Sequence, residues 1–151
     1  HDDDVAGREG GHENLLDISQ INDCPFCVDL NSATLHRRGA SFEKIATLQA
    51  WRGSDLFNDA ERAALAYAEA MTLSDNRIND EMMVKLQRHF NEDAVVELTG
   101  LIAFQNLSSK FNSALGVPPQ GFCQLPNATG DVGSGRREAG ISNHNASGLE
   151  G

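Results

Sequence analysis

Two cysteines three residues apart, Cys24 and Cys27, are the side chains of this chain best suited to chemistry. Residues i and i+3 of a helix share one face, so the two sulfurs could meet within a single turn. Asn22 or Asp23 could cap such a helix, and Pro25 would fall in its first turn, where a missing N–H costs little. A thiol at a helix start faces unpaired N–H groups and the positive end of the helix dipole, which favour the reactive thiolate. The pair therefore predicts a redox-active dithiol.

Two other uses of a close cysteine pair fit this sequence less well. A zinc site needs four ligands, usually from a second close pair, whereas here only Cys123 and five scattered histidines remain. A purely structural disulfide suits small secreted chains, but a bond between residues three apart closes too small a loop to stabilise a fold by chain entropy. We therefore predict no metal and no cofactor.

Composition limits the possible partners and the cellular location. The net charge of −10 over 151 residues argues against binding nucleic acid or an anionic membrane, because both require basic patches. No apolar run reaches the length that spans a bilayer. Three cysteines with one close pair suit a reducing cytoplasm better than export, so we expect a cytoplasmic protein. The chain begins without Met and shows no signal peptide, so we expect a truncated or processed N-terminus.

The elements that must position the dithiol are all helical in pattern, and no strand-like alternation is long enough to predict a sheet. An apolar stripe predicts a first helix from about residue 12 to 20, and the dithiol helix should run to about Arg38, with Gly39 as its C-cap. Ser41 should cap a helix that continues through Trp51. Further helices are predicted at about 59–73, 80–89 and 92–115, with caps at Asn58 and Asn91 for the first and last of these.

These helices define one domain and predict a compact all-α bundle of about six helices over residues 12–119. Residues 1–11 are acidic and Gly-rich and are interpreted as an irregular lead-in. Residues 120–151 are Gly-rich and polar, and we expect an irregular tail because such a segment buries too little surface to offset its ordering entropy.

The residues around the dithiol resemble the alkylhydroperoxidase D-like proteins of the carboxymuconolactone decarboxylase family. The resemblance rests first on residues 19–30 (SQINDCPFCVDL) and extends, in the right order, from His12 to Pro119. The later matching stretches are residues 51–52 (WR), 56–57 (LF), 61–66 (ERAALA), 104–106 (FQN) and 116–119 (GVPP).

The resemblance implies an all-helical protein that reduces hydroperoxides through its dithiol, is re-reduced by a thiol or dithiol protein, and assembles as a trimer or hexamer. It also implies that Cys27 attacks the peroxide and Cys24 resolves the sulfenic acid. The position nearer the helix start would instead make Cys24 the more acidic thiol, so the residues alone leave the order open.

Two positions depart from the family's proton relay. The family has a His four residues after the second cysteine, where this chain has Asn31. It has a Glu twelve residues before the first cysteine, where this chain has His12, with Glu13 beside it. Asn can form hydrogen bonds but cannot titrate, whereas histidine is the residue type whose ordinary pKa lies near neutral, so His12 could take over the relay.

Three functions follow from these observations. The first is a thiol-dependent peroxidase or disulfide reductase. The second is the lyase activity of the family's namesake, a carboxymuconolactone decarboxylase, which uses acid–base groups and gives the cysteines no role. The third is a catalytically weakened oligomeric scaffold, which the altered relay positions favour. A thiol titration before and after peroxide treatment separates the first from the other two.

Overall fold

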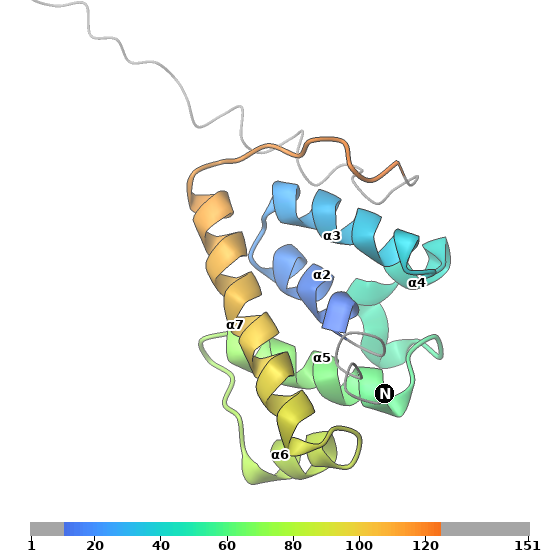
Figure 1. Ribbon diagram of the computed structural model, residues 1–151, viewed down its shortest axis with the longest axis vertical. Coiled ribbons are helices and arrows are strands. Elements are labelled where there is room, and N and C mark those ends of the chain that lie inside the picture. Colours follow the sequence, from blue (N-terminus) through green and yellow to red (C-terminus); the bar gives the residue numbers. More distant parts are fainter. Residues whose placement is uncertain (1–10, 125–151) are drawn as a thin grey trace, which may run out of the picture.

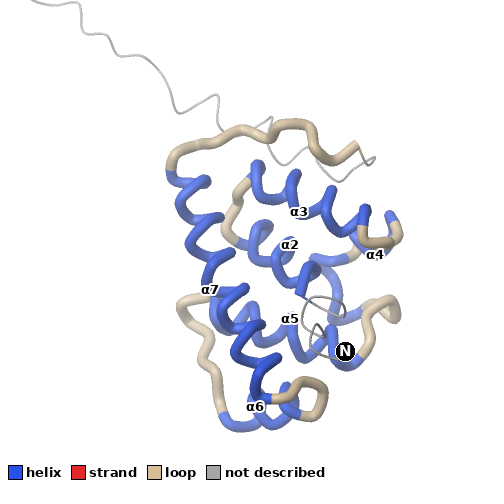
Figure 2. Tube along the Cα trace, in the orientation of Figure 1, coloured by secondary structure: helices blue, strands red, loops and turns tan. Residues whose placement is uncertain are grey.

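The computed structural model describes residues 11–124, and every regular element within them is a helix (Figure 2). The elements follow in the order α2 (Gly11–Ile21), α3 (Pro25–Arg37), α4 (Phe42–Ala46), the 3₁₀ helix η1 (Leu48–Gly53), α5 (Asp59–Thr72), α6 (Asp80–Gln87) and α7 (Glu92–Ala114). The predicted all-α class is confirmed. No helix in this described part is long and apolar enough to cross a membrane.

Local sequence sets most helix ends, as predicted. The side chains of Ser41, Asn58 and Asn91 each accept a hydrogen bond from the backbone N–H three residues later, at the starts of α4, α5 and α7. Asn79 caps α6 in the same way. Gly39 follows the end of α3 with φ of +100°, a conformation that glycine adopts without a Cβ penalty.

The single helix predicted from Ser41 through Trp51 is wrong, because the chain breaks it into α4 and η1. The backbone leaves helical geometry within η1 at Ala50, with φ −111° and ψ 30°. Leu48 and Trp51 are both buried, and residues i and i+3 point to the same side of a 3₁₀ helix. The tighter turn therefore turns both side chains into the core.

The core consists of two clusters that share α2. Ile18 contributes to a cluster with α5, α6 and α7, whereas Leu16 packs into a cluster with α3, α4, η1 and α5. Figure 1 shows α2 in the interior, with α3 on one side, α5 on another and α7 crossing past its end. Two alanines of α5, Ala64 and Ala68, are fully buried, in keeping with small residues that let helices approach closely.

The packed part of the chain extends beyond Pro119, the predicted end of the domain. Residues 120–124 form no helix, but they lie along α3 (Figure 1) and Cys123 is buried in the Leu16 cluster. The Asp29 carboxylate of α3 accepts hydrogen bonds from the backbone N–H groups of Gln120, Phe122 and Cys123, at 2.7 to 3.0 Å. The rest of the predicted tail, and residues 1–10 of the predicted lead-in, lie outside the described residues.

Asp29 is thus a buried anion that fixes this segment. Burial by itself would raise the pKa of Asp29, but the N–H groups of Cys123, Phe122 and Gln120 hold the pKa below its ordinary value. The carboxylate therefore stabilises the fold above pH 4, and that stabilisation is lost as the pH falls through the lowered pKa.

Replacing this anion by a neutral amide should be costly. We expect Asp29→Asn to lower the free energy of unfolding at pH 7 by about 3 kcal/mol, because charge-assisted bonds are lost and an NH₂ group then faces N–H donors. Urea unfolding measures the difference, which should shrink below pH 4. A variant as stable as the wild type at pH 7 would contradict the role of Asp29 as an anchor.

Candidate functional site

Cys24 and Cys27 form a disulfide at the start of α3, with their Cα atoms 5.2 Å apart. This agrees with the expectation that the two sulfurs could meet within a single turn, since a disulfide joins Cα atoms up to roughly 7 Å apart. Cys24 is the N-cap of α3 and Pro25 follows in the first turn. The Cys24 Sγ accepts a hydrogen bond from the Cys27 backbone N–H at 3.2 Å. The helix start therefore stabilises negative charge on the Cys24 sulfur when the pair is reduced.

The turn between α2 and α3 holds the pair against α7. Asp23 adopts a left-handed conformation with φ of +50°, which reverses the chain within three residues. The Asn22 amide donates to Ser109 Oγ at 2.8 Å, and Ser113 Oγ donates to the Asp23 carbonyl at 2.9 Å. Asn112 Nδ2 lies 3.9 Å from Cys27 Sγ. One polar face of α7 thus fixes the dithiol turn, a role that the sequence pattern did not predict.

Both sulfurs are shielded within the chain, with Cys24 0% and Cys27 2% exposed. Phe26, between them in sequence, packs edge-on against Phe122 with ring centroids 6.2 Å apart. Cys27 is the less completely buried cysteine and the one next to the Asn112 amide. Both cysteines are therefore almost completely covered by the described part of the chain.

Asn31 lies one turn after Cys27 on the same face of α3, but it sits in a network of amides and hydroxyls. Its Nδ2 donates to Ser19 Oγ at 2.9 Å, to Gln105 Oε1 at 3.3 Å and to the Leu15 carbonyl at 3.4 Å. Gln105 Nε2 in turn donates to Ser19 Oγ at 3.2 Å. None of these side chains titrates near neutral pH, so the network cannot take up a proton there.

His12 and Glu13 stand in the first turn of α2, at the far end of this helix from the dithiol turn. A helix rises 1.5 Å per residue, so roughly 14 Å of helix separates His12 from Ile21. Glu13 lies 3.6 Å from Lys44 Nζ, which also pairs with Glu61 at 2.6 Å. The structure thus brings Cys24, Cys27 and Asn31 together but places Glu13 with α4 and α5. The relay role of His12 stays a prediction.

A buried acid pair, which the sequence pattern did not predict, joins α2 to α5. Asp17 is 3% exposed and is hydrogen-bonded to Glu69, which also accepts from Trp51 Nε1 at 2.8 Å and pairs with Arg52 at 2.7 Å. Burial, together with the charge of Glu69, raises the pKa of Asp17 to about 8. Although burial opposes it, hydrogen bonds from Trp51, Arg52 and Asp17 lower the pKa of Glu69. The signal in the sequence was an acid inside the apolar stripe of the first helix.

This pair predicts a pH-dependent stability. Because Asp17 keeps its proton in the folded state and loses it near pH 4 when unfolded, stability should fall as the pH rises from about 4 to about 8. The slope should reach at most about 1.4 kcal/mol per pH unit. Asp17→Asn keeps a hydrogen-bond donor without a titrating proton, so this variant should show a flatter profile and be more stable than the wild type at pH 8.

Urea unfolding between pH 5 and 8 tests this expectation. The window lies above the lowered pKa of Glu69, so that carboxylate stays charged throughout. Parallel profiles for the wild type and Asp17→Asn would show that Asp17 is already ionised in the folded protein.

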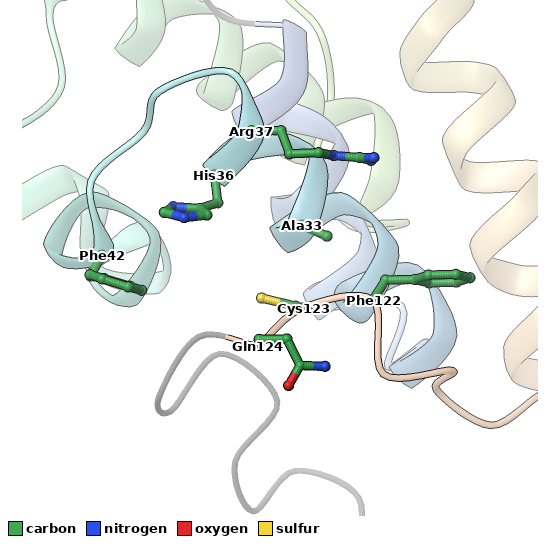
Figure 3. A pocket seen from close by; sticks show the side chains of 7 residues that line it. All are labelled: Ala33, His36, Arg37, Phe42, Phe122, Cys123 and Gln124. Atoms are coloured by element: carbon green, nitrogen blue, oxygen red, sulfur yellow. The ribbon is translucent and has the colours of Figure 1, made fainter.

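The third cysteine lies apart from the dithiol. The backbone N–H of Cys123 donates to the Asp29 carboxylate. Asp29 comes two residues after Cys27 and therefore lies on the opposite side of α3. Cys123 lines an open hollow of about 380 Å³ with His36, Phe42 and Phe122, among others (Figure 3). His36 stacks on Phe42 there, on a face of α3 away from the disulfide. Within residues 11–124, no group of three or more His, Cys, Asp or Glu side chains could hold a metal ion.

The sequence matches the profile of the carboxymuconolactone decarboxylase family over residues 16–70. The uncharacterized protein YnjA of Escherichia coli (strain K12) is 44% identical over 109 residues, which are 72% of this chain and 60% of YnjA. The uncharacterized protein YdfG of Bacillus subtilis (strain 168) is 31% identical over 100 residues, which are 66% of this chain and 68% of YdfG. The chain therefore spans less than two thirds of the length of YnjA.

Solved structures share the fold. ATU0492 of Agrobacterium tumefaciens, a protein of unknown function linked by name to AhpD antioxidant defence, superposes with a TM-score of 0.69 at 27% identity, covering 72% of this chain and 75% of that one. The debrominase Bmp8 superposes with a TM-score of 0.63 at 26% identity, covering 79% of this chain and 61% of Bmp8. A cysteine-to-alanine variant of Bmp8, in complex with 2,3,4-tribromopyrrole, gives a TM-score of 0.62.

The family profile, the two bacterial relatives and the AhpD-like fold agree with one another and with the dithiol at the start of α3. The chain belongs to the carboxymuconolactone decarboxylase family and is an AhpD-like member of it.

Proposed function

We propose that the chain is a thiol-dependent peroxidase that reduces hydroperoxides through the Cys24–Cys27 pair. One observation carries this proposal: the two cysteines are bonded to each other at a helix start, where a thiolate is stabilised. The second function considered, the lyase, requires acid–base groups near its substrate. The side chains that surround Asn31, next to the dithiol, are amides and hydroxyls.

In the proposed reaction, the Cys27 thiolate attacks the outer peroxide oxygen and the O–O bond breaks. The departing alkoxide takes a proton and leaves as an alcohol, and Cys27 becomes a sulfenic acid. The Cys24 thiolate then attacks the Cys27 sulfur, which forms the disulfide and releases hydroxide, which is protonated to water. A thiol or dithiol protein restores the reduced pair by exchange.

The cap geometry supports one of the two orders of attack that the sequence leaves open. A thiolate at Cys24 is stabilised by the Cys27 N–H, and a more acidic thiol is the better leaving group in disulfide exchange. The reductant would therefore attack Cys27, and Cys24 would depart as the stabilised thiolate. This assignment keeps Cys27 as the attacking cysteine toward peroxide and Cys24 as the resolving one.

A thiol count tests the proposal. The reduced protein has three thiols, and a stoichiometric amount of hydroperoxide should leave one, that of Cys123, when the protein is denatured and titrated. A dithiol reductant should restore the count to three. A count that stays at three after peroxide treatment would reject the peroxidase and favour the lyase or the scaffold.

A second substrate class follows from the likeness to Bmp8. A thiolate that attacks an O–O bond could also take bromine from a brominated aromatic ring. The C–Br bond then breaks, an S–Br bond forms, and the ring carbon gains a proton. The second thiolate attacks the brominated sulfur, which forms the disulfide and releases bromide. The probe is 2,3,4-tribromopyrrole, the compound bound in the Bmp8 variant. Bromide release together with loss of two thiols would support this activity, and an unchanged thiol count would exclude it.

We also propose that the protein assembles as a homo-oligomer, a trimer or a hexamer. The proposal is supported by the membership of an AhpD-like family and by the apolar surface of α7. Light scattering that detects only a monomer at working concentration would reject it.

A further inference from the structure

Helix α7 presents a continuous apolar stripe that this chain leaves uncovered. Its five large members are 61% to 72% exposed, although α7 as a whole packs on α2, α3, α5 and α6. The members are Val96, Phe104, Leu107, Phe111 and Leu115. Figure 1 shows α7 running along one edge of the molecule, from α6 at one end to residues 117–124 at the other.

The spacing makes these residues one face of one helix. With Gly100 included, the steps along the stripe are four, four, three, four and four, which keeps every member on the same side over roughly 29 Å. Side chains that span roughly 150–200 Å² each and are about two thirds exposed amount to roughly 500 Å² of apolar surface. That lies at the upper end of patches on monomers and approaches the area that each partner buries in a stable interface.

No contact within the described part of this chain requires a glycine at position 100. Gly100 lies within a 23-residue helix, where glycine weakens the helix, yet a Cβ placed on it would meet nothing within 4 Å. Ala103 is also exposed beside Phe104 on this surface. Small residues on an exposed apolar stripe leave room for large side chains from a second helix, as in other close helix packings.

The charged residues on this exposed side differ in sign between the two ends of the stripe. Glu92, Asp93 and Glu97 lie toward its N-terminal end, and Lys110 lies toward its C-terminal end. Two copies packed in parallel would bring the acidic ends together, whereas an antiparallel pair places each acidic end beside the partner's Lys110. The helix dipoles favour the antiparallel arrangement as well.

We infer that a second copy of this chain covers the stripe through a two-fold antiparallel contact between α7 helices, centred between Ala103 and Phe104. In this register, the numbers of any two residues that face each other across the contact add up to 207. Val96 of one copy therefore lies beside Phe111 of the other, and Gly100 lies beside Leu107. The same register sets Glu97 beside Lys110. A two-fold contact is self-complementary, so each of these pairs occurs twice.

This inference rests on the proposed homo-oligomer and specifies it. A two-fold contact gives dimers or, combined with a trimeric contact, hexamers, and it is incompatible with an isolated trimer. It does not depend on peroxidase activity.

The first experiment places a charge at the centre of the contact. Phe104→Glu should halve the mass measured by light scattering, from hexamer to trimer or from dimer to monomer, while the helical signal in circular dichroism is retained. The matched control is Val84→Glu, which changes an exposed apolar residue of α6 and should leave the mass unchanged. A wild-type monomer would overturn the assembly as a whole, and an unchanged mass for Phe104→Glu would overturn the α7 contact.

The second experiment tests the antiparallel register. Glu97→Lys and Lys110→Glu should each raise the dissociation constant of the two-fold contact roughly 3- to 10-fold, because each creates two like-charge pairs. The double variant should restore the wild-type value. If the double variant binds as weakly as the two single effects combined would predict, with no recovery of the dissociation constant, the register is overturned. The thiol count after peroxide, measured on the same samples, reports separately on the proposed chemistry.

Discussion

Replacing Cys27 by serine is expected to lower hydroperoxide turnover at least roughly 10³-fold, because a serine hydroxyl neither attacks the O–O bond nor forms a disulfide. The variant should remain folded, since Cys27 is a small side chain and its backbone N–H still donates to Cys24 Sγ. Peroxide consumption with a dithiol reductant is the measurement.

Cys24→Ser separates the roles of the two cysteines. If Cys27 attacks and Cys24 resolves, this variant should react once and then retain a sulfenic acid that a sulfenic-acid probe detects. Cys123→Ser is the matched control, because Cys123 is buried on the opposite side of α3 and should not affect turnover. A sulfenic acid trapped only in the Cys27→Ser protein would reverse the assignment and make Cys24 the attacking residue.

Introducing a titratable group at the relay position should raise turnover. Asn31 is 8% exposed, one turn from Cys27, and its three acceptors are a hydroxyl, an amide and a carbonyl. A general base typically contributes about 10²–10⁴-fold in rate. We therefore expect Asn31→His to increase peroxide turnover at neutral pH by about 10²-fold, with a gain that declines in acid as the imidazole is protonated and with little change in the disulfide potential.

The control for this prediction is Asn31→Gln, which lengthens the amide without adding a base and should show no gain. Urea unfolding of both variants reports whether the larger side chain disturbs the network of Ser19 and Gln105. His12→Ala completes the set. Loss of activity in that variant, together with no effect of Asn31→His, would assign the relay to His12. A fast wild type that neither change affects would show that the dithiol needs no relay.

Local patterns predicted the helical skeleton because their information lies within a few residues. The caps at Ser41, Asn58 and Asn91 act on N–H groups three positions away. The approach of Cys24 to Cys27 depends on a single helical turn. Over residues 41–53, helical periodicity was misleading because the need to bury Leu48 and Trp51 together determined the backbone.

What the sequence by itself determined was therefore the all-α class, the helix starts and a dithiol within one turn. Only the tertiary structure decided what surrounds that dithiol. Asp29 binds the backbone of Gln120, Phe122 and Cys123, more than 90 residues away, and so brings a segment of tail-like composition into the core. Asn31 meets Gln105 and Asp17 meets Glu69 only once α2, α3, α5 and α7 have packed. A buried polar group must find its partner wherever the fold places one, and no periodicity along the chain records that position.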